Sequence, residues 1–167
     1  MSIGIVIVLA LIQGVTEFLP ISSKTHLLLA QELFGLRDPE SNLFVIVMLH
    51  AGSLMAVFIY YWKAWLELFR SRRFEILYIL VGSVPVALVG LLFKKRIEAL
   101  FGNPALGCGL LLVTAAWLLA AERFGRQQHD YDRVPLWKIF LVGAAQMAAL
   151  FPGISRSGST IGAGYLA

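Results

Sequence analysis

The sequence predicts an all-α integral membrane protein: a polytopic helical bundle with two re-entrant helix-loop-helix hairpins in an inverted repeat. Three observations predict it: the composition, three long apolar segments, and two apolar segments that break at a proline and serines. Of the 167 residues, 59% are hydrophobic and 14% are charged, whereas soluble domains are roughly 45–50% apolar and about 25% charged. The composition argues against a soluble enzyme, a disordered tail and a secreted disulfide scaffold.

The charge and the cysteine content agree with a membrane protein. The formal net charge is +4 and the isoelectric point is about 9.5, but the basic residues lie between apolar segments, where membrane proteins keep them. We therefore expect a bilayer as the partner and no nucleic acid. The single cysteine, Cys108, lies in an apolar segment and is predicted to be a packing residue.

Three segments are predicted to cross the membrane: residues 43–62, 76–93 and 105–121. A helix rises about 1.5 Å per residue, so roughly 20 apolar residues span a hydrocarbon core of about 30 Å. His50 is the only His, Lys, Arg, Asp or Glu residue of the first span, and we interpret it as a partner in a hydrogen bond between helices. Pro85 lies inside the second span, where neighbouring helices can satisfy the carbonyl that it frees.

Residues 1–36 and 136–167 are predicted to form the two re-entrant hairpins, the second of them incomplete. Each is interrupted, at residues 18–26 and 151–158. Only about 13–17 residues remain on each side of the first break, which suits a hairpin better than a straight crossing. Non-helical backbone at membrane depth is tolerated only inside protein or beside a wet cavity, so both breaks are candidate sites. No Lys or Arg precedes the first apolar segment, so we expect it to be retained rather than cleaved, and residues 1–167 to form one membrane domain.

The two breaks share a pattern. A glutamine is followed at five, eight and nine positions by Phe, Ile and Ser; the matching sets are Gln13, Phe18, Ile21 and Ser22, and Gln146, Phe151, Ile154 and Ser155. An odd number of spans lies between the hairpins, so the second would enter from the opposite face. This is the inverted repeat that is typical of transporter-like folds.

The distribution of basic residues predicts the orientation. The loops at residues 63–75 and 122–138 hold eight Lys and Arg residues, and those at 30–42 and 94–104 hold four. The positive-inside rule places the first pair in the cytoplasm, so the amino terminus and the first hairpin start from the outer face.

Ionisable groups that are costly in a membrane gather at the two breaks. Glu17, Lys24 and His26 lie at the first break and Arg156 at the second, although such a group at the bilayer centre costs roughly 2.5–3.5 kcal/mol. Arg156 is a forked donor that suits phosphate oxygens. A helix is predicted to begin after each break, with its N–H groups aimed at the break, where phosphate binds readily. The candidate caps are Ser22 or Ser23 in the first break and Ser155 or Ser157 in the second.

The first break also carries a catalytic pattern. Ser23 and His26 are three residues apart, so on one helical turn they share a face and would act as nucleophile and proton acceptor. Glu17 and Gln13, one turn apart, offer oxygens to a hard divalent cation, which a diphosphate would also bind.

The same residue types have structural interpretations. A serine after a proline is often only a helix cap, a glutamate in a span is often a hydrogen-bond partner, and an arginine often extends toward the headgroups. For Lys24, a phosphate ligand and a residue that extends to the membrane surface stay equally open. What favours function is that the costly groups lie in two matching breaks.

The two motifs resemble the signatures of a known family. Residues 13–23, Gln-Gly-Val-Thr-Glu-Phe-Leu-Pro-Ile-Ser-Ser, followed by His26, resemble the first signature of the undecaprenyl-diphosphate phosphatases, the bacitracin-resistance proteins. Residues 152–160, Pro-Gly-Ile-Ser-Arg-Ser-Gly-Ser-Thr, resemble their second signature. Residues 49–53 and 84–85 also fit the family's spans, so the resemblance covers essentially the whole chain.

The resemblance implies an activity and a location. The expected reaction is hydrolysis of undecaprenyl (C55) diphosphate to undecaprenyl phosphate and phosphate, which recycles the lipid carrier for cell-wall synthesis. The expected protein is a multi-pass enzyme of the bacterial inner membrane, with a site open to the periplasmic face. The expected cofactor is a divalent cation, magnesium or calcium, and the expected partner is the polyprenyl diphosphate lipid. A homodimer stays open.

The resemblance also implies roles for residues. The implied catalytic residues are Ser23 as nucleophile, His26 as acid/base, Arg156 as diphosphate ligand and Glu17, which is also the implied metal ligand. The implied substrate-binding residues are Gln13, Ser22, Gly153, Ser155, Ser157 and Thr160. A water molecule in place of Ser23 stays open as the nucleophile.

Two departures from the family pattern stand out. Lys24 and Thr25 occupy positions where small residues are expected. Family members continue through further spans, so we expect the chain to be a fragment. Two rival functions stay open: a transporter or flippase for polyprenyl phosphate or an anionic lipid that uses the same paired site, and a non-catalytic membrane module.

Overall fold

Helices are the only regular secondary structure in the part of the chain that the computed structural model describes, which is residues 2–36, 38–100, 103–125 and 134–167. The elements in chain order are α1 (Ile3–Thr16), α2 (Ser23–Leu33), α3 (Pro39–Tyr60), α4 (Trp62–Arg70), α5 (Arg73–Leu92), α6 (Lys94–Leu100), α7 (Pro104–Phe124), α8 (Leu136–Ala145), the 3-10 helix η1 (Gln146–Leu150) and α9 (Arg156–Leu166).

Helices α3, α5 and α7 are long and apolar enough to cross a membrane. They overlap the three predicted spans, and α5 continues through Pro85. Asp38 begins α3 as its N-cap, and the Ser41 hydroxyl that donates to this carboxyl lowers the pKa of Asp38. The prediction of an all-helical membrane protein is confirmed.

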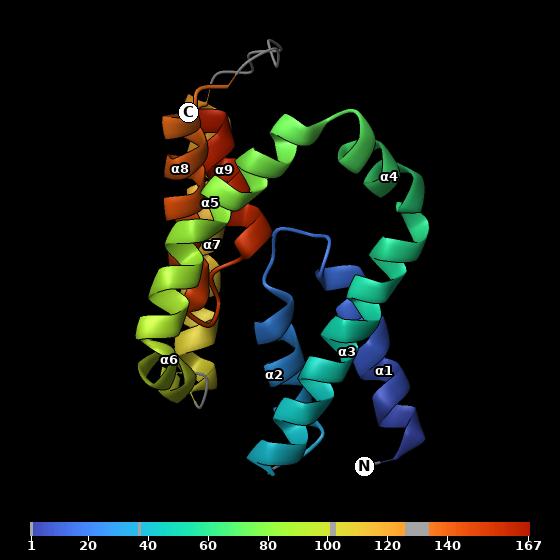
Figure 1. Ribbon diagram of the computed structural model, residues 1–167. Coiled ribbons are helices and arrows are strands. Elements are labelled where there is room, and N and C mark those ends of the chain that lie inside the picture. The colour runs from blue at the N-terminus through green and yellow to red at the C-terminus, as the bar shows by residue number, and fades with distance from the viewer. Residues whose placement is uncertain (1, 37, 101–102, 126–133) are drawn as a thin grey trace.

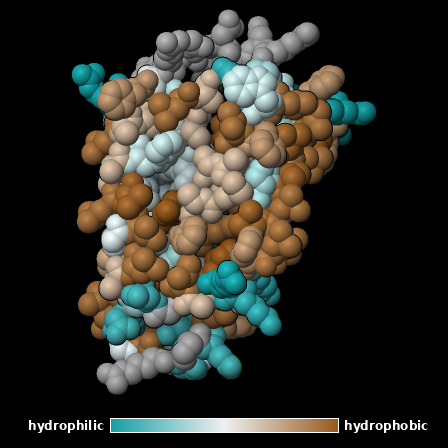
Figure 2. Space-filling model, turned by 90° about the vertical axis from the view of Figure 1, so that its left-hand side faces the viewer, coloured by the Kyte–Doolittle hydropathy of each residue, from teal (hydrophilic) through white to brown (hydrophobic). Residues whose placement is uncertain are grey.

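The interior of the molecule is more polar than its surface. Leu9, Leu27, Ala30 and Ala121 are the buried hydrophobic residues of the described chain. Beside them lies a larger set of buried polar side chains: Gln13, Thr16, Ser22, Ser23, Thr25, Gln31, Thr114, Ser155 and Ser159. Hydrophobic residues cover most of the height of the face in Figure 2, and hydrophilic residues lie at its upper and lower ends. This distribution suits a lipid-facing exterior around a polar centre.

The two broken segments form hairpins that open toward opposite ends of the molecule. The α1–α2 hairpin opens at the lower end in Figure 1, beside the amino terminus, and the α8–α9 hairpin opens at the upper end, beside the carboxyl terminus. Helix α8 approaches α5 so closely that a Cβ atom on Gly143 would collide with the backbone of Gly82. The arrangement agrees with the predicted inverted repeat; insertion of the hairpins into a bilayer stays a prediction.

Two segments that the sequence analysis treated as loops contain helices. Residues 63–75 include most of α4, and residues 94–104 include α6. Both helices are short and carry several charges, so a search for long apolar segments does not find them. Helix α4 lies at the upper end in Figure 1 and α6 at the lower end, so these two basic helices lie at opposite ends.

Candidate active site

A cavity of about 360 Å³ lies between the two breaks. The predicted site residues that line it are Glu17, Ser22, Ser23, Ser155, Arg156, Ser157 and Thr160, together with Lys24. The breaks also contact each other directly, because the Ser157 hydroxyl donates to the Leu19 carbonyl oxygen at 3.3 Å, across 138 positions of sequence. The structure therefore brings together the polar residues of both motifs.

The first break turns through a left-handed serine. Ser22 precedes α2 with φ 64° and ψ 82°, a conformation that is uncommon outside glycine and that gathers at functional sites. The predicted serine cap of this helix is wrong. Ser22 makes no capping hydrogen bond; its hydroxyl lies 3.3 Å from that of Thr25. Ser23 begins α2, and its hydroxyl turns back toward α1 instead.

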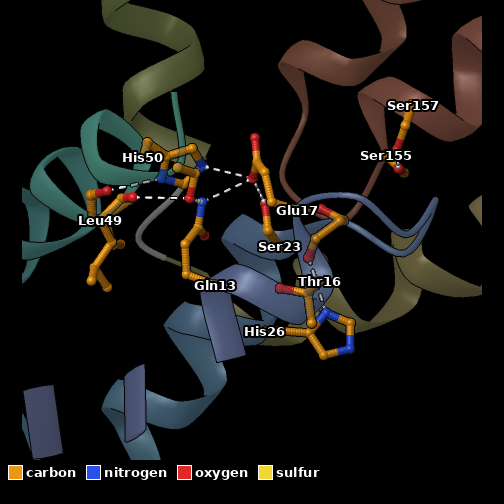
Figure 3. A network of polar contacts seen from close by, with 12 residues as sticks. Gln13, Thr16, Glu17, Ser23, His26, Leu49, His50, Ser155 and Ser157 are labelled. Atoms are coloured by element: carbon orange, nitrogen blue, oxygen red, sulfur yellow. Dashed lines mark hydrogen bonds and ion pairs between the residues drawn. The ribbon is translucent and has the colours of Figure 1, made fainter. Parts of the chain in front are cut away.

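One carboxylate oxygen collects the polar contacts of the first break. Glu17 Oε2 accepts a hydrogen bond from Ser23 Oγ at 2.5 Å and another from Gln13 Nε2 at 3.0 Å. Nε2 of His50, on α3, lies 3.4 Å from the same oxygen. Figure 3 shows the three side chains converging on Glu17. A carboxylate this close to a hydroxyl is placed to accept its proton.

The second break is held by a cap and by a threonine of α7. Ser155 Oγ accepts from the Gly158 N–H at 3.1 Å, so Ser155 caps α9, as one of the two predicted candidates. Thr114 Oγ1 donates to the Gly153 carbonyl at 3.0 Å and accepts from the Ser155 N–H at 3.2 Å. Arg156 is the first residue of α9 and is exposed at the cavity.

Replacing Thr114 by valine is expected to destabilise the second break. Valine keeps the volume but removes both hydrogen bonds and leaves two backbone groups without them, which costs about 1–3 kcal/mol. The measurement is the midpoint of thermal unfolding in detergent. Ser83→Ala is the control, because that hydroxyl bonds only its own helix at an exposed position. Equal midpoints for the two variants would contradict the structural role of Thr114.

His26 lies apart from this cluster. It does not line the cavity, and its Nδ1 lies 3.0 Å from the Ser22 carbonyl oxygen. In Figure 3 the imidazole points away from the Glu17 carboxylate. The spacing of Ser23 and His26 predicted that the two side chains would face each other. In the structure the Ser23 hydroxyl instead donates a hydrogen bond to Glu17. The acid/base role of His26 stays a prediction.

Two further predicted residues support the site without lining the cavity. Gln13 donates to Glu17 and also to the Ser53 hydroxyl of α3, at 3.2 Å. Gly153 turns the chain at the second break with φ 93°.

Sequence reasoning did not place His50 in the site. It did predict a hydrogen bond between helices, and the contact of His50 with Glu17 joins α3 to the first break. The available signal was the isolation of this imidazole in an otherwise apolar span.

The site offers few ligands for a divalent cation. Oε1 of Gln13 is buried without a hydrogen-bond partner, one turn from Glu17. Within the described residues, no three His, Cys, Asp or Glu side chains gather to hold a metal ion. Magnesium is commonly bound by one or two carboxylates together with substrate phosphates and water, whereas calcium takes six to eight oxygens. Glu17 is the one carboxylate that lines the cavity in the described residues, so it would need phosphate and water ligands beside it to hold magnesium; the metal site stays a prediction.

The comparison with known families covers both breaks and all of the cavity lining. The family model of bacitracin resistance protein BacA matches residues 6–167. The chain belongs to the BacA family. The match begins within α1 and ends beyond α9, so every residue that lines the cavity lies inside it.

Three similar relatives are named undecaprenyl-diphosphatase. The undecaprenyl-diphosphatase of Moorella thermoacetica is 42% identical over 168 residues, which are 96% of this chain and 64% of the relative. That of Rhodopirellula baltica is 38% identical over 162 residues, 96% of this chain and 62% of the relative. That of Thermodesulfovibrio yellowstonii is 35% identical over 158 residues, 95% and 61%. The chain thus spans somewhat less than two thirds of the length of these relatives.

Proposed function

We propose that the protein hydrolyses undecaprenyl diphosphate to undecaprenyl phosphate and phosphate at the cavity between the breaks. The observation that carries the proposal is the meeting of Ser23 and Glu17 with Arg156 in that cavity. A nucleophile with a proton acceptor faces a guanidinium that suits phosphate oxygens. The relatives' name, undecaprenyl-diphosphatase, supports this substrate.

In the proposed mechanism Ser23 attacks the terminal phosphorus of the diphosphate. The bond to the bridging oxygen breaks, the lipid phosphate leaves with that electron pair, and the Ser23 proton passes to Glu17 Oε2. Water then hydrolyses the phosphoserine and releases inorganic phosphate. Arg156 and the N–H groups at the start of α9 stabilise the negative charge that develops on the phosphoryl oxygens. A magnesium ion, held by Glu17 together with the diphosphate, would supply further positive charge.

We also propose the setting of the reaction. The protein is a bacterial inner-membrane protein, with the basic segment at α4 in the cytoplasm and the amino-terminal end toward the periplasm. The count of Lys and Arg in the predicted loops supports this orientation, and the basic helices α4 and α6 lie at opposite ends. The hairpins would then enter the membrane from opposite faces, and the diphosphate would reach the cavity at membrane depth.

Replacing Arg156 by alanine tests the proposed function. We expect phosphate release from farnesyl or undecaprenyl diphosphate by the purified full-length protein in detergent to fall roughly 10²-fold, because a donor to the transferring phosphoryl group is lost. Arg156→Lys keeps the positive charge but loses the paired N–H donors of the guanidinium. Its rate of phosphate release should lie between those of the unsubstituted protein and Arg156→Ala. Near-normal turnover of Arg156→Ala would refute the assignment.

A second candidate function is transport of a polyprenyl phosphate or another anionic lipid across the membrane. The opposed opening of the two hairpins favours it, because carriers are often built from inverted repeats with broken helices. Phosphate release separates the two functions: a carrier without hydrolase activity releases none from the diphosphate substrate.

A further inference from the structure

We propose that His50 is a positioning residue, which holds the Glu17 carboxylate from α3 in the orientation that faces Ser23. This inference rests on the proposed hydrolysis. His50 belongs to neither break, yet its Nε2 lies 3.4 Å from the Glu17 oxygen that accepts the Ser23 hydroxyl. Both side chains are about three quarters buried, with 23% and 28% of their surface exposed.

The imidazole is itself oriented by its own helix. Nδ1 of His50 lies 2.8 Å from the Ile46 carbonyl oxygen. A carbonyl oxygen only accepts, so Nδ1 carries a hydrogen and donates it, and the Nε2 edge is directed at Glu17. A hydrogen on Nε2 as well makes the imidazole a donor to the carboxylate and leaves Glu17 ionised, as acceptance of the Ser23 proton requires. His50 also lines the cavity, so it fixes the reactive group from the wall beside it.

Gln13 of α1 connects the same carboxylate to α3 a second time. Gln13 Nε2 donates both to Glu17 Oε2 and to Ser53 Oγ, and Ser53 in turn donates to the Leu49 carbonyl at 3.1 Å. Glu17 is thus held from α1 and α3 while Ser23 of α2 approaches it. A glutamate has several rotatable bonds, so without these partners its carboxylate would leave the proton-accepting position for much of the time.

Two polar substitutions distinguish the contact that Nε2 of His50 makes from the contact that Nδ1 makes. His50→Gln places an amide N–H where Nε2 lies and keeps the contact with Glu17. His50→Asn is one methylene shorter; it places an amide N–H where Nδ1 lies and keeps only the contact with Ile46. We expect His50→Asn to lower kcat about 10- to 100-fold with KM within about threefold, and His50→Gln to recover kcat to within about threefold of the unsubstituted protein.

The outcomes separate positioning from other roles. Recovery by asparagine and not by glutamine would show that His50 only supports α3, and a loss confined to KM would show that it binds substrate; either overturns the inference. If the unsubstituted full-length protein releases no phosphate, the proposed function fails, and a double-mutant cycle in thermal unfolding decides about His50. Non-additive midpoints for His50→Asn and Glu17→Gln would support the contact, and additive midpoints would overturn it.

Discussion

Replacing Glu17 by glutamine is expected to lower kcat for phosphate release roughly 10²- to 10⁴-fold, with a smaller change in KM. Glutamine is nearly isosteric, so the packing of α1 is kept. Its amide cannot accept the Ser23 proton, and an NH2 group at the position of Oε2 would face two donors, Gln13 Nε2 and Ser23 Oγ, without accepting from either. The measurement is steady-state release of inorganic phosphate by the purified full-length protein in detergent.

The control for this substitution lies on the same hairpin. Glu32 is an exposed glutamate near the end of α2, so Glu32→Gln makes the same chemical change away from the cavity. We expect it to leave kcat within about twofold, as surface substitutions rarely disturb the structure. Activity of Glu17→Gln within tenfold of the unsubstituted protein would refute a proton-accepting role for Glu17.

Replacing Gly153 by alanine is expected to destabilise the protein by about 2–4 kcal/mol. Gly153 has φ 93°, a conformation that residues with a Cβ rarely adopt. A Cβ atom there would also collide with the carbonyl oxygen of Gly107 and with Leu110, both on α7. The backbone would have to shift, and with it the Thr114 contacts that hold the second break. The measurement is thermal or denaturant unfolding in detergent micelles.

Gly109→Ala is the matched control, because it makes the same substitution on α7 where a Cβ would meet nothing within 4 Å. Inside a helix alanine is favoured over glycine by roughly 0.5–1 kcal/mol, so this variant should be as stable as the unsubstituted protein or more so. If Gly153→Ala and Gly109→Ala unfolded alike, the tight approach of the second break to α7 would not exist in solution.

The secondary structure of this chain was largely legible from hydropathy and turn-forming residues. Membrane-crossing helices can be recognised in a sequence by their length and apolar composition, so the three predicted spans overlap α3, α5 and α7. The proline, glycine and serine residues of the breaks also appeared where the helices stop. The short helices α4 and α6 were not predicted. Each is short and carries charged residues, so its helical structure depends on neighbouring elements and is not evident from apolar composition.

The partners of individual side chains were less predictable. Spacing along one helix suggested that Ser23 faces His26, but a left-handed Ser22 turns the Ser23 hydroxyl to Glu17 instead. The serine cap was predicted for both breaks and formed only at Ser155. Both differences occur beside one residue, Ser22, whose left-handed backbone is uncommon for a residue with a Cβ and is not predicted by helical spacing.

Local properties of the chain were therefore sufficient for its membrane character, its long helices and the two polar breaks, because each depends on residues that are neighbours in sequence. That the breaks share one site was expected from the sequence and is confirmed. The tertiary structure alone decided which contacts join them, with Ser157 against Leu19, and that His50 of α3 reaches Glu17. Those contacts depend on how helices cross and how closely their backbones approach, and no short stretch of sequence encodes that.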